Sequence, residues 1–461
     1  MGKIDKMKKY DFIIGYEHKV REIESVCLLK YELERRRYSV LIYNTNDDRF
    51  KEKINKYYAK VLILPYAYDD KIISFCVGKS IKFDKIINLQ WEQAIYKQQE
   101  DEKTSYRNPS GISCQAMHIA WGEANKRRLT HIVGLNEENV SVAGNMTLDF
   151  LKNPLKNFYM DRKELFFKYQ IPEEKRVCLF ISSFKSATLS DETLNEWCRI
   201  YGEWRREQHN VAKRTLKEIL RWIEKAIQED SNLFFVYRPH PGEHTQFVDE
   251  LESKCKNFKV ISDLSVKQWI IATDVVYTWM STTVVESFFA NKSCYLVYPY
   301  ELPKEAMVRL FEESLSIKNY EVFKQSIYSQ KINRPISADK IKPYYNTDDG
   351  MSYKKVADIC EKIYKDSKYL IEEIEKKNIY NLQYRDKTIY KRCKMWFWQF
   401  RFIRAIILIF GKCFSKNKFL NKKVQDNEKY LEWKKKEMVT DEQLKMISEK
   451  IKVCLEVEYE N

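Results

Sequence analysis

Short apolar runs alternate with segments of helical periodicity along most of the chain. The first six runs predict β-strands at residues 11–16 (DFIIGY), 39–44, 61–66, 85–91, 118–122 and 140–144. Between the first two runs, VREIESVCLLKYELERRR (20–37) places its apolar residues at helical spacing. Alternation of strand and helix is typical of βαβ units and predicts a parallel sheet.

The alternation starts again after a stretch that contains Pro, Lys and Asn, LKNPLKNFYMDRK (151–163). Further strands are predicted at 176–183, 233–239, 258–263, 274–279 and 293–299. Two doubly wound halves of similar size predict two Rossmann-like domains that face each other across a cleft. We expect an α/β protein with domains at 1–155 and 156–370, followed by a helical extension at 371–461.

Polar and ionisable residues follow the predicted strands. Ligands of open parallel sheets bind outside the carboxyl ends of the strands, so these residues are the candidates for a site. In the first half they are Glu17, His18, Lys19, Arg21, Glu22, Glu92 and Glu123. In the second half they are Ser182, Ser183, Lys185, Arg238, His240, Glu243, Ser281, Thr282, Thr283 and Glu286.

The stretch FFVYRPHPGE (234–243) ends an apolar strand in an arginine and a histidine held between two prolines. The prolines fix the backbone, so Arg238 and His240 leave the strand end in set directions. The planar fork of arginine suits phosphate oxygens, and histidine donates to phosphate or acts as an acid. The alternative is an ordinary turn with a capping histidine.

A hydroxyl-rich turn follows another strand in TWMSTTVVESFFANKSCYLVYP (278–299). It places Ser281, Thr282 and Thr283 at a helix N-terminus, where backbone N–H groups and the helix dipole favour an anion. Glu286, one turn further, is in position to reach a sugar hydroxyl. A plain Ser/Thr N-cap is the alternative, but together with RPHP the turn favours a nucleotide mono- or diphosphate site.

Other nucleotide and metal chemistry lacks its motifs. The chain has 11 glycines and contains neither GxGxxG nor a P-loop, which argues against dehydrogenases and P-loop kinases. No Asp-x-Asp occurs, and Pro241 and Gly242 interrupt the His240–His244 spacing. We therefore expect no metal site and no cofactor beyond a nucleotide-linked substrate, with basic and hydroxyl groups stabilising the leaving phosphate.

The net charge of +15 is concentrated near the C-terminus. Residues 385–425 hold twelve Lys/Arg and one acidic residue, and they include MWFWQFRFIRAIILIF (395–410), which is too short and too charged to span a bilayer comfortably. On a helix, six of these basic residues share one face, which predicts an interfacial helix on anionic lipid; they are Lys387, Lys391, Lys394, Arg401, Arg404 and Lys412. The alternative is a helix packed on the protein. No nucleic-acid motif accompanies the charge, and the helix at 441–461 has no assigned purpose.

The sequence resembles bacterial surface-carbohydrate enzymes of the GT-B glycosyltransferase type, and more distantly capsular Kdo transferases and CDP-glycerol glycerophosphotransferases. The resemblance covers about residues 10–365 and is carried by EHKVREIES (17–25), INLQWEQ (87–93), AWGE (120–123), VAGN (142–145), YRPHPGE (237–243), TWMSTTVVES (278–287) and YYNTDDGMSY (344–353). It departs from the usual pattern at 290–292, where Gly-Lys is common.

The resemblance implies roles for individual residues. His240 would contact the donor phosphate and Glu286 the ribose, with a donor that is CMP- or CDP-linked. The N-terminal half would hold the acceptor, with Glu92, Glu17 and Glu22, in that order, as candidate base or nucleophile. The candidate acceptor contacts are His18, Lys19, Arg21, Trp91 and Glu123. Trp91 either stacks on a sugar or fills the core.

We therefore expect a glycosyltransferase that acts on a surface glycan or a lipid-linked acceptor. The alternatives are a non-hydrolysing nucleotide-sugar epimerase on the same fold and a non-catalytic partner in a polysaccharide assembly complex. The 11 cysteines lack paired spacing, and the apolar run at 12–15 is too short for a signal peptide. These features predict a cytoplasmic protein, which the basic stretch would hold at the inner face of the membrane.

Overall fold

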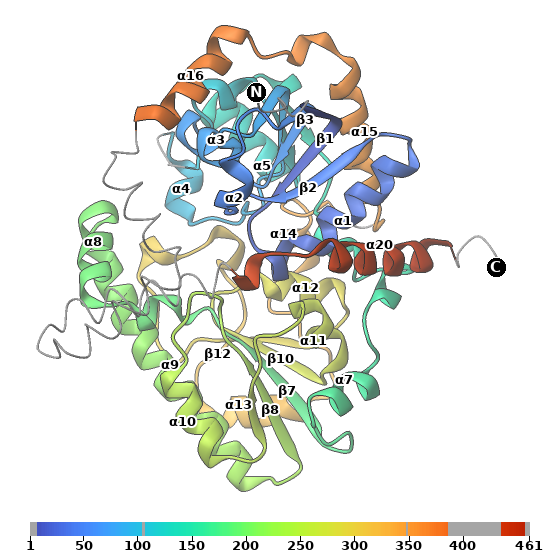
Figure 1. Ribbon diagram of the computed structural model, residues 1–461. Helices are drawn as coiled ribbons and strands as arrows, with labels where there is room; N and C mark the ends of the chain where they lie inside the picture. Colours follow the sequence, from blue (N-terminus) through green and yellow to red (C-terminus); the bar gives the residue numbers. More distant parts are fainter. Residues whose placement is uncertain (1–6, 104–106, 347–348, 386–434, 457–461) are drawn as a thin grey trace, which may run out of the picture.

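The computed structural model describes residues 7–103, 107–346, 349–385 and 435–456. Two parallel six-stranded sheets lie in separate halves of the molecule (Figure 1). The first domain contains the sheet in the order β2-β1-β3-β4-β5-β6. Its strands are β1 (Lys8–Tyr16), β2 (Val40–Asn44), β3 (Tyr57–Leu64), β4 (Ile81–Asn88), β5 (Met117–Ala120) and β6 (Val140–Val142).

Helices cover both faces of the first sheet. They are α1 (Lys19–Arg35), α2 (Asp48–Lys51), α3 (Asp70–Val77), α4 (Lys97–Asp101), α5 (Glu123–Arg127) and α6 (Met146–Asp149). In β1, Phe12 and Ile14 share a buried cluster with the apolar face of α1, whereas Ile13 belongs to the cluster that includes α3. Because both faces of the sheet are buried, its strands are almost continuously apolar, which made them recognisable in the sequence.

The second domain repeats this arrangement with the order β12-β11-β10-β7-β8-β9. Its strands are β7 (Arg176–Ile181), β8 (Leu233–Arg238), β9 (Phe258–Val260), β10 (Val275–Thr278), β11 (Cys294–Val297) and β12 (Ser316–Ile317). Its helices are α7 (Arg162–Lys168), α8 (Asp191–Tyr201), α9 (Trp204–Glu229), α10 (Gln246–Lys254), α11 (Val266–Ala272), α12 (Thr283–Phe289), α13 (Tyr320–Ile327) and α14 (Ala338–Ile341). All eleven predicted strands are present, and the two-residue β12 was missed.

The predicted boundary at residue 370 needs a correction. Helix α15 (Ser352–Lys365) packs on α1 and on β3 and β4, so the chain has already returned to the first domain. The buried Lys85 of β4 fixes this return, because its ammonium donates to the carbonyls of Ile363, Tyr364 and Asp366 at 2.7–2.8 Å. Cations at a helix C-terminus satisfy the last carbonyls and complement the helix dipole.

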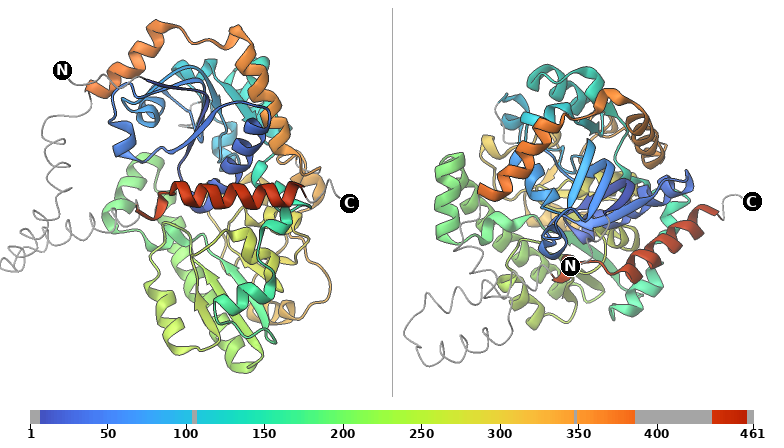
Figure 2. Two further views of the ribbon diagram at one scale, coloured as in Figure 1. Left: turned by 45° about the vertical axis from the view of Figure 1, so that its right-hand side comes forward. Right: turned by 45° about the horizontal axis from the view of Figure 1, so that its top comes forward.

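Two C-terminal helices also pack on the first domain. Helix α16 (Glu373–Arg385) lies against α3, and α20 (Asp441–Glu456) lies against α1. In Figures 1 and 2, α20 (red) runs along the boundary between the two halves of the molecule. Leu444, Ile447 and Ile451, spaced by three and four residues, turn one face of α20 toward the core. The charged helix without an assigned purpose is therefore a structural part of the molecule.

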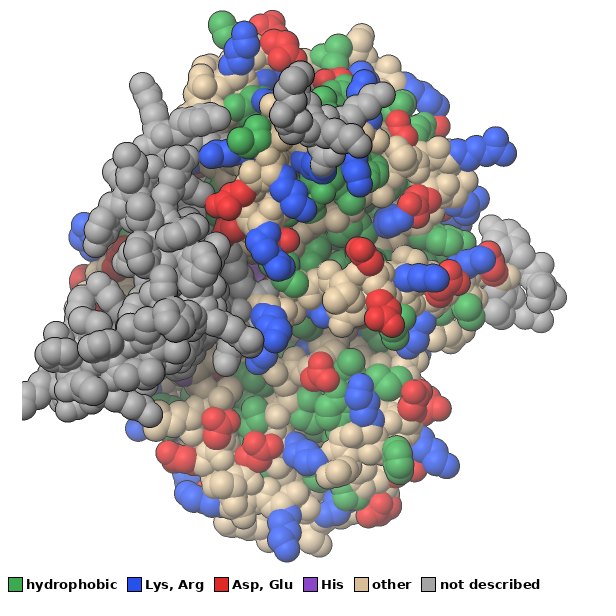
Figure 3. Space-filling view, in the orientation of Figure 1, with side chains coloured by type: hydrophobic (Ala, Val, Ile, Leu, Met, Phe, Trp, Pro, Cys, Tyr) green, Lys and Arg blue, Asp and Glu red, His purple; other side chains and the backbone are tan. Residues whose placement is uncertain are grey.

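The basic stretch predicted to bind membranes falls, apart from Arg385, outside the described residues. In the described part of the chain, no helix is both long and apolar enough to cross a bilayer. On the face drawn in Figure 3, Lys/Arg and Asp/Glu side chains are interspersed over both domains. The charge seen on this face is thus mixed rather than gathered in one basic field.

Candidate active site

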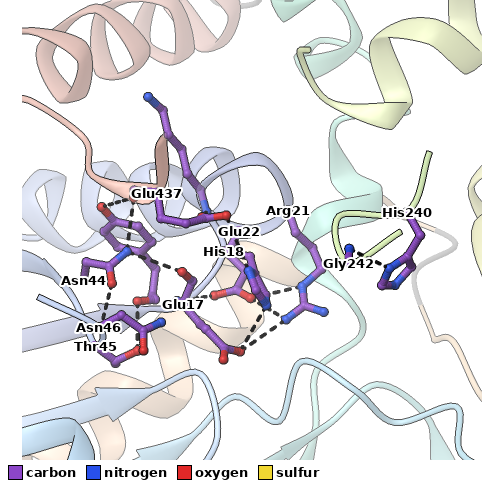
Figure 4. Close-up of polar contacts among 12 residues, drawn as sticks. Glu17, His18, Arg21, Glu22, Asn44, Thr45, Asn46, His240, Gly242 and Glu437 are labelled. Atoms are coloured by element: carbon purple, nitrogen blue, oxygen red, sulfur yellow. Dashed lines mark hydrogen bonds and ion pairs between the residues drawn. The ribbon is translucent and has the colours of Figure 1, made fainter. Parts of the chain in front are cut away.

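In each sheet there is one strand from which the chain order runs outward in opposite directions on the two sides. β1 lies between β2 and β3, and β7 lies between β8 and β10. Ligands of open parallel sheets bind at such switch points, outside the carboxyl ends of the strands. The loops after β1 and β8 come together here: His240, which follows β8, lies close enough to Arg21, which follows β1, for the two charges to interact (Figure 4).

The first domain contributes most of a set of ionisable side chains that we call the charged cluster. It consists of Glu17, His18, Arg21, Glu22, Glu92, Arg107 and Glu437. Glu22 is its buried anchor. Its carboxylate accepts the backbone N–H of Glu17 at 2.7 Å and pairs with the Arg21 guanidinium at 2.7 Å. Both contacts hold the start of α1, so Glu22 is placed as a structural carboxylate.

Glu92, the first candidate base, is engaged in two ion pairs. Its carboxylate lies 3.1 Å from Arg21 and 2.8 Å from Arg107. Burial acts to raise the pKa of Glu92, but the two guanidinium groups outweigh burial and lower it. A carboxylate with a lowered pKa is a weaker base at neutral pH. The geometry therefore favours Glu92 as an orienting group for Arg21.

Glu17 differs from Glu92 in its surroundings. Burial raises the pKa of Glu17, and the neighbouring Glu22 adds to this shift while His18 opposes it. The Glu17 carboxylate lies 3.6 Å from His18 Nε2 and 3.7 Å from Arg21. Its side chain is about one-quarter exposed (27%), so a substrate hydroxyl has access to it. Among the three candidate carboxylates, Glu17 best combines access with a raised pKa.

The loop after β8 forms a fixed turn around His240. The carboxylate of Glu243 accepts the backbone N–H of His240 at 3.2 Å and the Tyr237 hydroxyl at 2.6 Å. The Gly242 N–H donates to His240 Nδ1 at 3.1 Å. The two prolines and these bonds set the direction of the imidazole, as the RPHP sequence predicted.

The hydrogen bond from Gly242 also assigns the tautomer of His240. Because Nδ1 accepts this bond, the proton of the neutral ring resides on Nε2. Burial lowers the pKa of His240 to about 4, and the charges of Lys185 and Arg21 act in the same direction. At neutral pH the side chain is thus an uncharged Nε2–H donor with the cations Lys185 and Arg21 nearby.

No protein-family model matches the chain, and no curated protein matches it. Among solved structures, a variant of the wall teichoic acid polymerase TagF is 12% identical with a TM-score of 0.50, over 78% of this chain and 91% of that one. The TagF fold is a GT-B pair of α/β domains, and the two parallel six-stranded sheets described above match it. This chain has the GT-B fold.

Two other solved structures are similar at lower scores. S. aureus MnaA, solved with UDP, is 14% identical with a TM-score of 0.45, over 76% of this chain and 95% of that one. The UDP-GlcNAc 2-epimerase of Methanocaldococcus jannaschii is 14% identical with a TM-score of 0.44, over 77% of this chain and 99% of that one. The expected GT-B resemblance is confirmed, by the TagF structure, as a likeness of fold.

Arg238 does not face the open edge of this GT-B pair. The side chain is buried, and its guanidinium donates to the backbone carbonyls of Asp263, at 2.6 Å, and Leu264. Burial lowers the pKa of Arg238 to about 10. The expectation that both Arg238 and His240 point at a phosphate is therefore corrected. Arg238 links β8 to the loop before α11, and of the two residues only His240 is placed to donate to a ligand.

Several predicted hydroxyl contacts are also used inside the protein. Ser182 donates to Glu243, and Ser183 donates to the carbonyl of Trp279. Ser281 accepts the backbone N–H of Thr283 at 3.3 Å and lies 3.0 Å from the Thr283 hydroxyl. Thr282 is the N-cap of α12 and makes no side-chain capping bond. These hydroxyls shape the loops, and a ligand role for them remains a prediction.

Glu286 lies in α12 close to the domain boundary. Burial raises its pKa to about 7, against the opposing charge of Lys267. Lys267 itself pairs across the boundary with Glu24 of α1, 3.5 Å away. A protonated Glu286 has a donor to offer as well as an acceptor, so the predicted sugar contact is chemically reasonable although untested.

The remaining acceptor candidates are dispersed. Trp91 is 7% exposed and part of the core, which supports the core-filling alternative over sugar stacking. Glu123 is exposed at the start of α5, and no contact joins it to the charged cluster. Lys19 begins α1, and its ammonium donates to Gln443 at 3.0 Å.

Two members of the site, Arg107 and Glu437, were not singled out from the sequence, and a third, Lys185, was named only as a residue that follows a strand. Lys185 follows β7, and a Cβ added at Gly242 would lie only 3.1 Å from the Lys185 side chain. Lys185 therefore lies beside the turn that holds His240, and its charge acts on that imidazole. The sequence showed that Lys185 follows a strand, but nothing in it predicted that Lys185 lies beside the RPHP turn. Arg107 and Glu437 carry no local motif. Within the described residues, no group of three His, Cys, Asp or Glu is arranged to hold a metal ion.

Proposed function

We propose that the protein is a GT-B transferase that moves a glycosyl or glycosyl-like group from a nucleotide-activated donor to a surface-carbohydrate acceptor. The observation that carries the proposal is His240: a neutral Nε2–H donor, fixed in a turn after β8, that faces the charged cluster of the other domain. A donor of this kind is suited to the phosphate oxygens on which negative charge develops when a nucleotide leaves. This assignment also follows the resemblance of the YRPHPGE stretch.

Departure of the nucleotide places negative charge on its phosphate oxygens. In the proposed complex, His240 Nε2–H donates to one of these oxygens, and the nearby Lys185 and Arg21 supply positive charge. Donors and charges that are already in place stabilise this developing charge without reorganisation. A hydrogen bond to a charged oxygen contributes about 1.5–3 kcal/mol.

The acceptor hydroxyl must lose its proton as it attacks the donor. Glu17 accepts this proton in the proposed mechanism, since its pKa is raised and its carboxylate is accessible. The bond between the donor group and its phosphate breaks, the bond to the acceptor oxygen forms, and the leaving phosphate keeps the electron pair. Glu92 and Arg107 hold Arg21 in place during this step.

The acceptor is proposed to be a glycan or a lipid-linked intermediate at the inner membrane surface. The support is the excess of Lys/Arg and aromatic residues at 385–425 in the sequence. Helices α16 and α20, which flank most of this stretch, both pack on the first domain. This is the domain that carries Glu17.

A panel of nucleotide-activated donors tests the proposal. CDP-glycerol, UDP-GlcNAc and a CMP-linked sugar are added to the full chain, and thermal unfolding is followed. A donor at one hundred times its Kd stabilises the fold by about 2.7 kcal/mol. The donor that stabilises is then incubated with and without acceptor glycan. Transfer supports the proposal, epimerised free nucleotide sugar identifies the epimerase alternative, and absence of stabilisation by every donor contradicts both.

A further inference from the structure

The segment before α20 returns to the carboxyl ends of β1 and β2, although Glu437 lies 421 residues after Tyr16 and 393 residues after Asn44 in the sequence. The carbonyl of Glu437 accepts the hydroxyl of Tyr16 and the amide of Asn44, each at 3.1 Å. Tyr16 and Asn44 are the last residues of β1 and β2. The Val439 N–H completes the attachment by donating to the Tyr16 hydroxyl at 3.2 Å.

This attachment places the Glu437 carboxylate at the start of α1. One carboxylate oxygen accepts the backbone N–H of Lys19, the first residue of α1, at 2.5 Å. The other lies 3.6 Å from His18 Nδ1. The Glu437 residue is 8% exposed, so both contacts are largely shielded from water. Figure 4 shows the carboxylate approaching His18 from the C-terminal segment.

The two ring nitrogens of His18 thus face two carboxylates. Nδ1 faces Glu437, and Nε2 lies 3.6 Å from Glu17. The result is a carboxylate–imidazole–carboxylate chain that ends at the candidate base. A side chain held from both sides in this way has one preferred orientation, and it transmits that orientation to its neighbour.

From this geometry we propose that Glu437 is a positioning residue of the active site, which orients His18 and through it Glu17. The inference rests on the proposed function only for the role of Glu17; the Glu437–His18 link stands on the contacts alone. It makes the C-terminal segment a component of the catalytic centre rather than an appendage. The alternative is that the segment blocks the site and can detach from it. The hydrogen bonds of its backbone to Tyr16 and Asn44 favour the positioning role over this alternative.

The ionisation of His18 reports on the link. The ionisable groups close to it are Glu17, Arg21, Glu22 and Glu92 of the first domain, Glu437 of the C-terminal segment and His240 of the second domain. Burial lowers the pKa of His18, but the neighbouring carboxylates, first Glu437 and then Glu17 and Glu22, outweigh burial and the repulsion of Arg21, so the pKa is raised. Removing the Glu437 charge removes the largest of the raising contributions.

The test compares full-length Glu437→Gln with wild type. Glutamine keeps an oxygen for the Lys19 N–H and loses the charge. With six histidines in the chain, NMR titration resolves His18 directly. We expect the His18 pKa to fall and kcat to drop about 10- to 100-fold with donor KM unchanged, as for a misplaced reacting group. Glu437→Asp recovers part of both effects, and the exposed Glu449→Gln of α20 changes neither.

Two outcomes overturn the inference: a His18 titration that is the same in Glu437→Gln and wild type, or a turnover of Glu437→Gln that equals or exceeds wild type. Higher turnover identifies the segment as an inhibitory plug instead. If no donor is converted by wild type, the proposed function fails, while the titration still decides whether Glu437 controls His18.

Discussion

Glu243 holds His240 in place: its carboxylate accepts the His240 backbone N–H at 3.2 Å. The same carboxylate accepts the buried Tyr237 hydroxyl at 2.6 Å and the Ser182 hydroxyl. One acidic side chain therefore joins the end of β8, the loop after β7 and the turn of the RPHP sequence. The geometry of this half of the candidate site therefore depends on a residue that does not itself need to touch a ligand.

Replacing Glu243 by alanine should lower both stability and donor affinity. The variant leaves the Tyr237 hydroxyl buried without its acceptor, which costs about 1–3 kcal/mol, and it frees the turn that sets the direction of His240. Urea unfolding measures the first effect and calorimetric titration of the donor the second. Glu250→Ala, exposed on α10, is the matched control. Wild-type stability together with wild-type affinity would show that the turn does not depend on Glu243.

Loss of His240 should weaken donor binding with little effect on the fold. His240→Ala removes one hydrogen bond to a charged oxygen, so affinity should fall roughly 10- to 150-fold. If the same donor also stabilises the leaving phosphate, the loss in kcat exceeds the loss in binding. His244→Ala is the control, since His244 is exposed four residues further on. Unchanged affinity in folded His240→Ala would refute the phosphate contact.

The strands were predictable because burial on both faces leaves an almost unbroken apolar run, as in FFVY before Arg238. Strand β12 was missed because two residues are too few to form a pattern. The destination of α15 was not predictable either: an amphipathic pattern shows that one face is buried, but not against which sheet. That choice depends on Lys85, whose partners are backbone carbonyls and leave no trace in the sequence.

The site was predictable to the same extent. The RPHP motif predicted a histidine with a fixed direction. Nothing in the sequence predicted that the Arg238 guanidinium donates to the carbonyls of Asp263 and Leu264. Which of Glu17, Glu22 and Glu92 is best suited to act as a base could not be predicted from the sequence either. The answer depends on the two arginines that pair with Glu92. Glu437 is the extreme case, since its neighbours lie at the opposite end of the chain.

Glu17 and Glu92 should respond differently to the same substitution. Glu17→Gln removes the proposed base, so turnover should fall by about 10²–10⁴-fold while donor affinity stays near wild type. Glu92→Gln leaves Glu17 in place as the base but removes an ion pair that holds Arg21. Its turnover should therefore fall less than that of Glu17→Gln, and its donor affinity should fall as well. Single-turnover kinetics and donor titration separate the two variants. Full turnover in Glu17→Gln together with inactive Glu92→Gln would return the role of base to Glu92.

Charge in the 385–425 stretch should determine vesicle binding. Each basic residue near an anionic surface contributes about 1 kcal/mol, so neutralising six of them should abolish sedimentation with phosphatidylglycerol vesicles. The six are Lys387, Lys391, Lys394, Arg401, Arg404 and Lys412. The control neutralises the same number of exposed lysines in the two domains, namely Lys53, Lys103, Lys163, Lys213, Lys217 and Lys254. Equal sedimentation by the two variants would assign binding to overall charge rather than to this stretch.

Acid should destabilise the first domain through His118. This residue is fully buried; its Nδ1 lies 3.1 Å from the Asn88 amide nitrogen, and its Nε2 lies 2.9 Å from the Ser113 carbonyl. Burial lowers the pKa of His118 to about 4 from 6.5. The unfolded chain therefore takes up a proton before the folded one does. The stability that depends on neutral His118 is complete above pH 6.5 and decreases as the pH falls to about 4, by up to about 3 kcal/mol.

Urea unfolding of the wild type and of His118→Gln at several pH values between 6.5 and 4 measures this contribution. The variant starts less stable at neutral pH, because its side chain no longer fits between Asn88 and Ser113, but it should lose less stability on acidification. His131→Gln, which removes an exposed histidine, should keep the wild-type slope. A slope for His118→Gln equal to that of the wild type would mean that the acid sensitivity arises elsewhere, with His240, whose pKa is also lowered to about 4, the next group to examine.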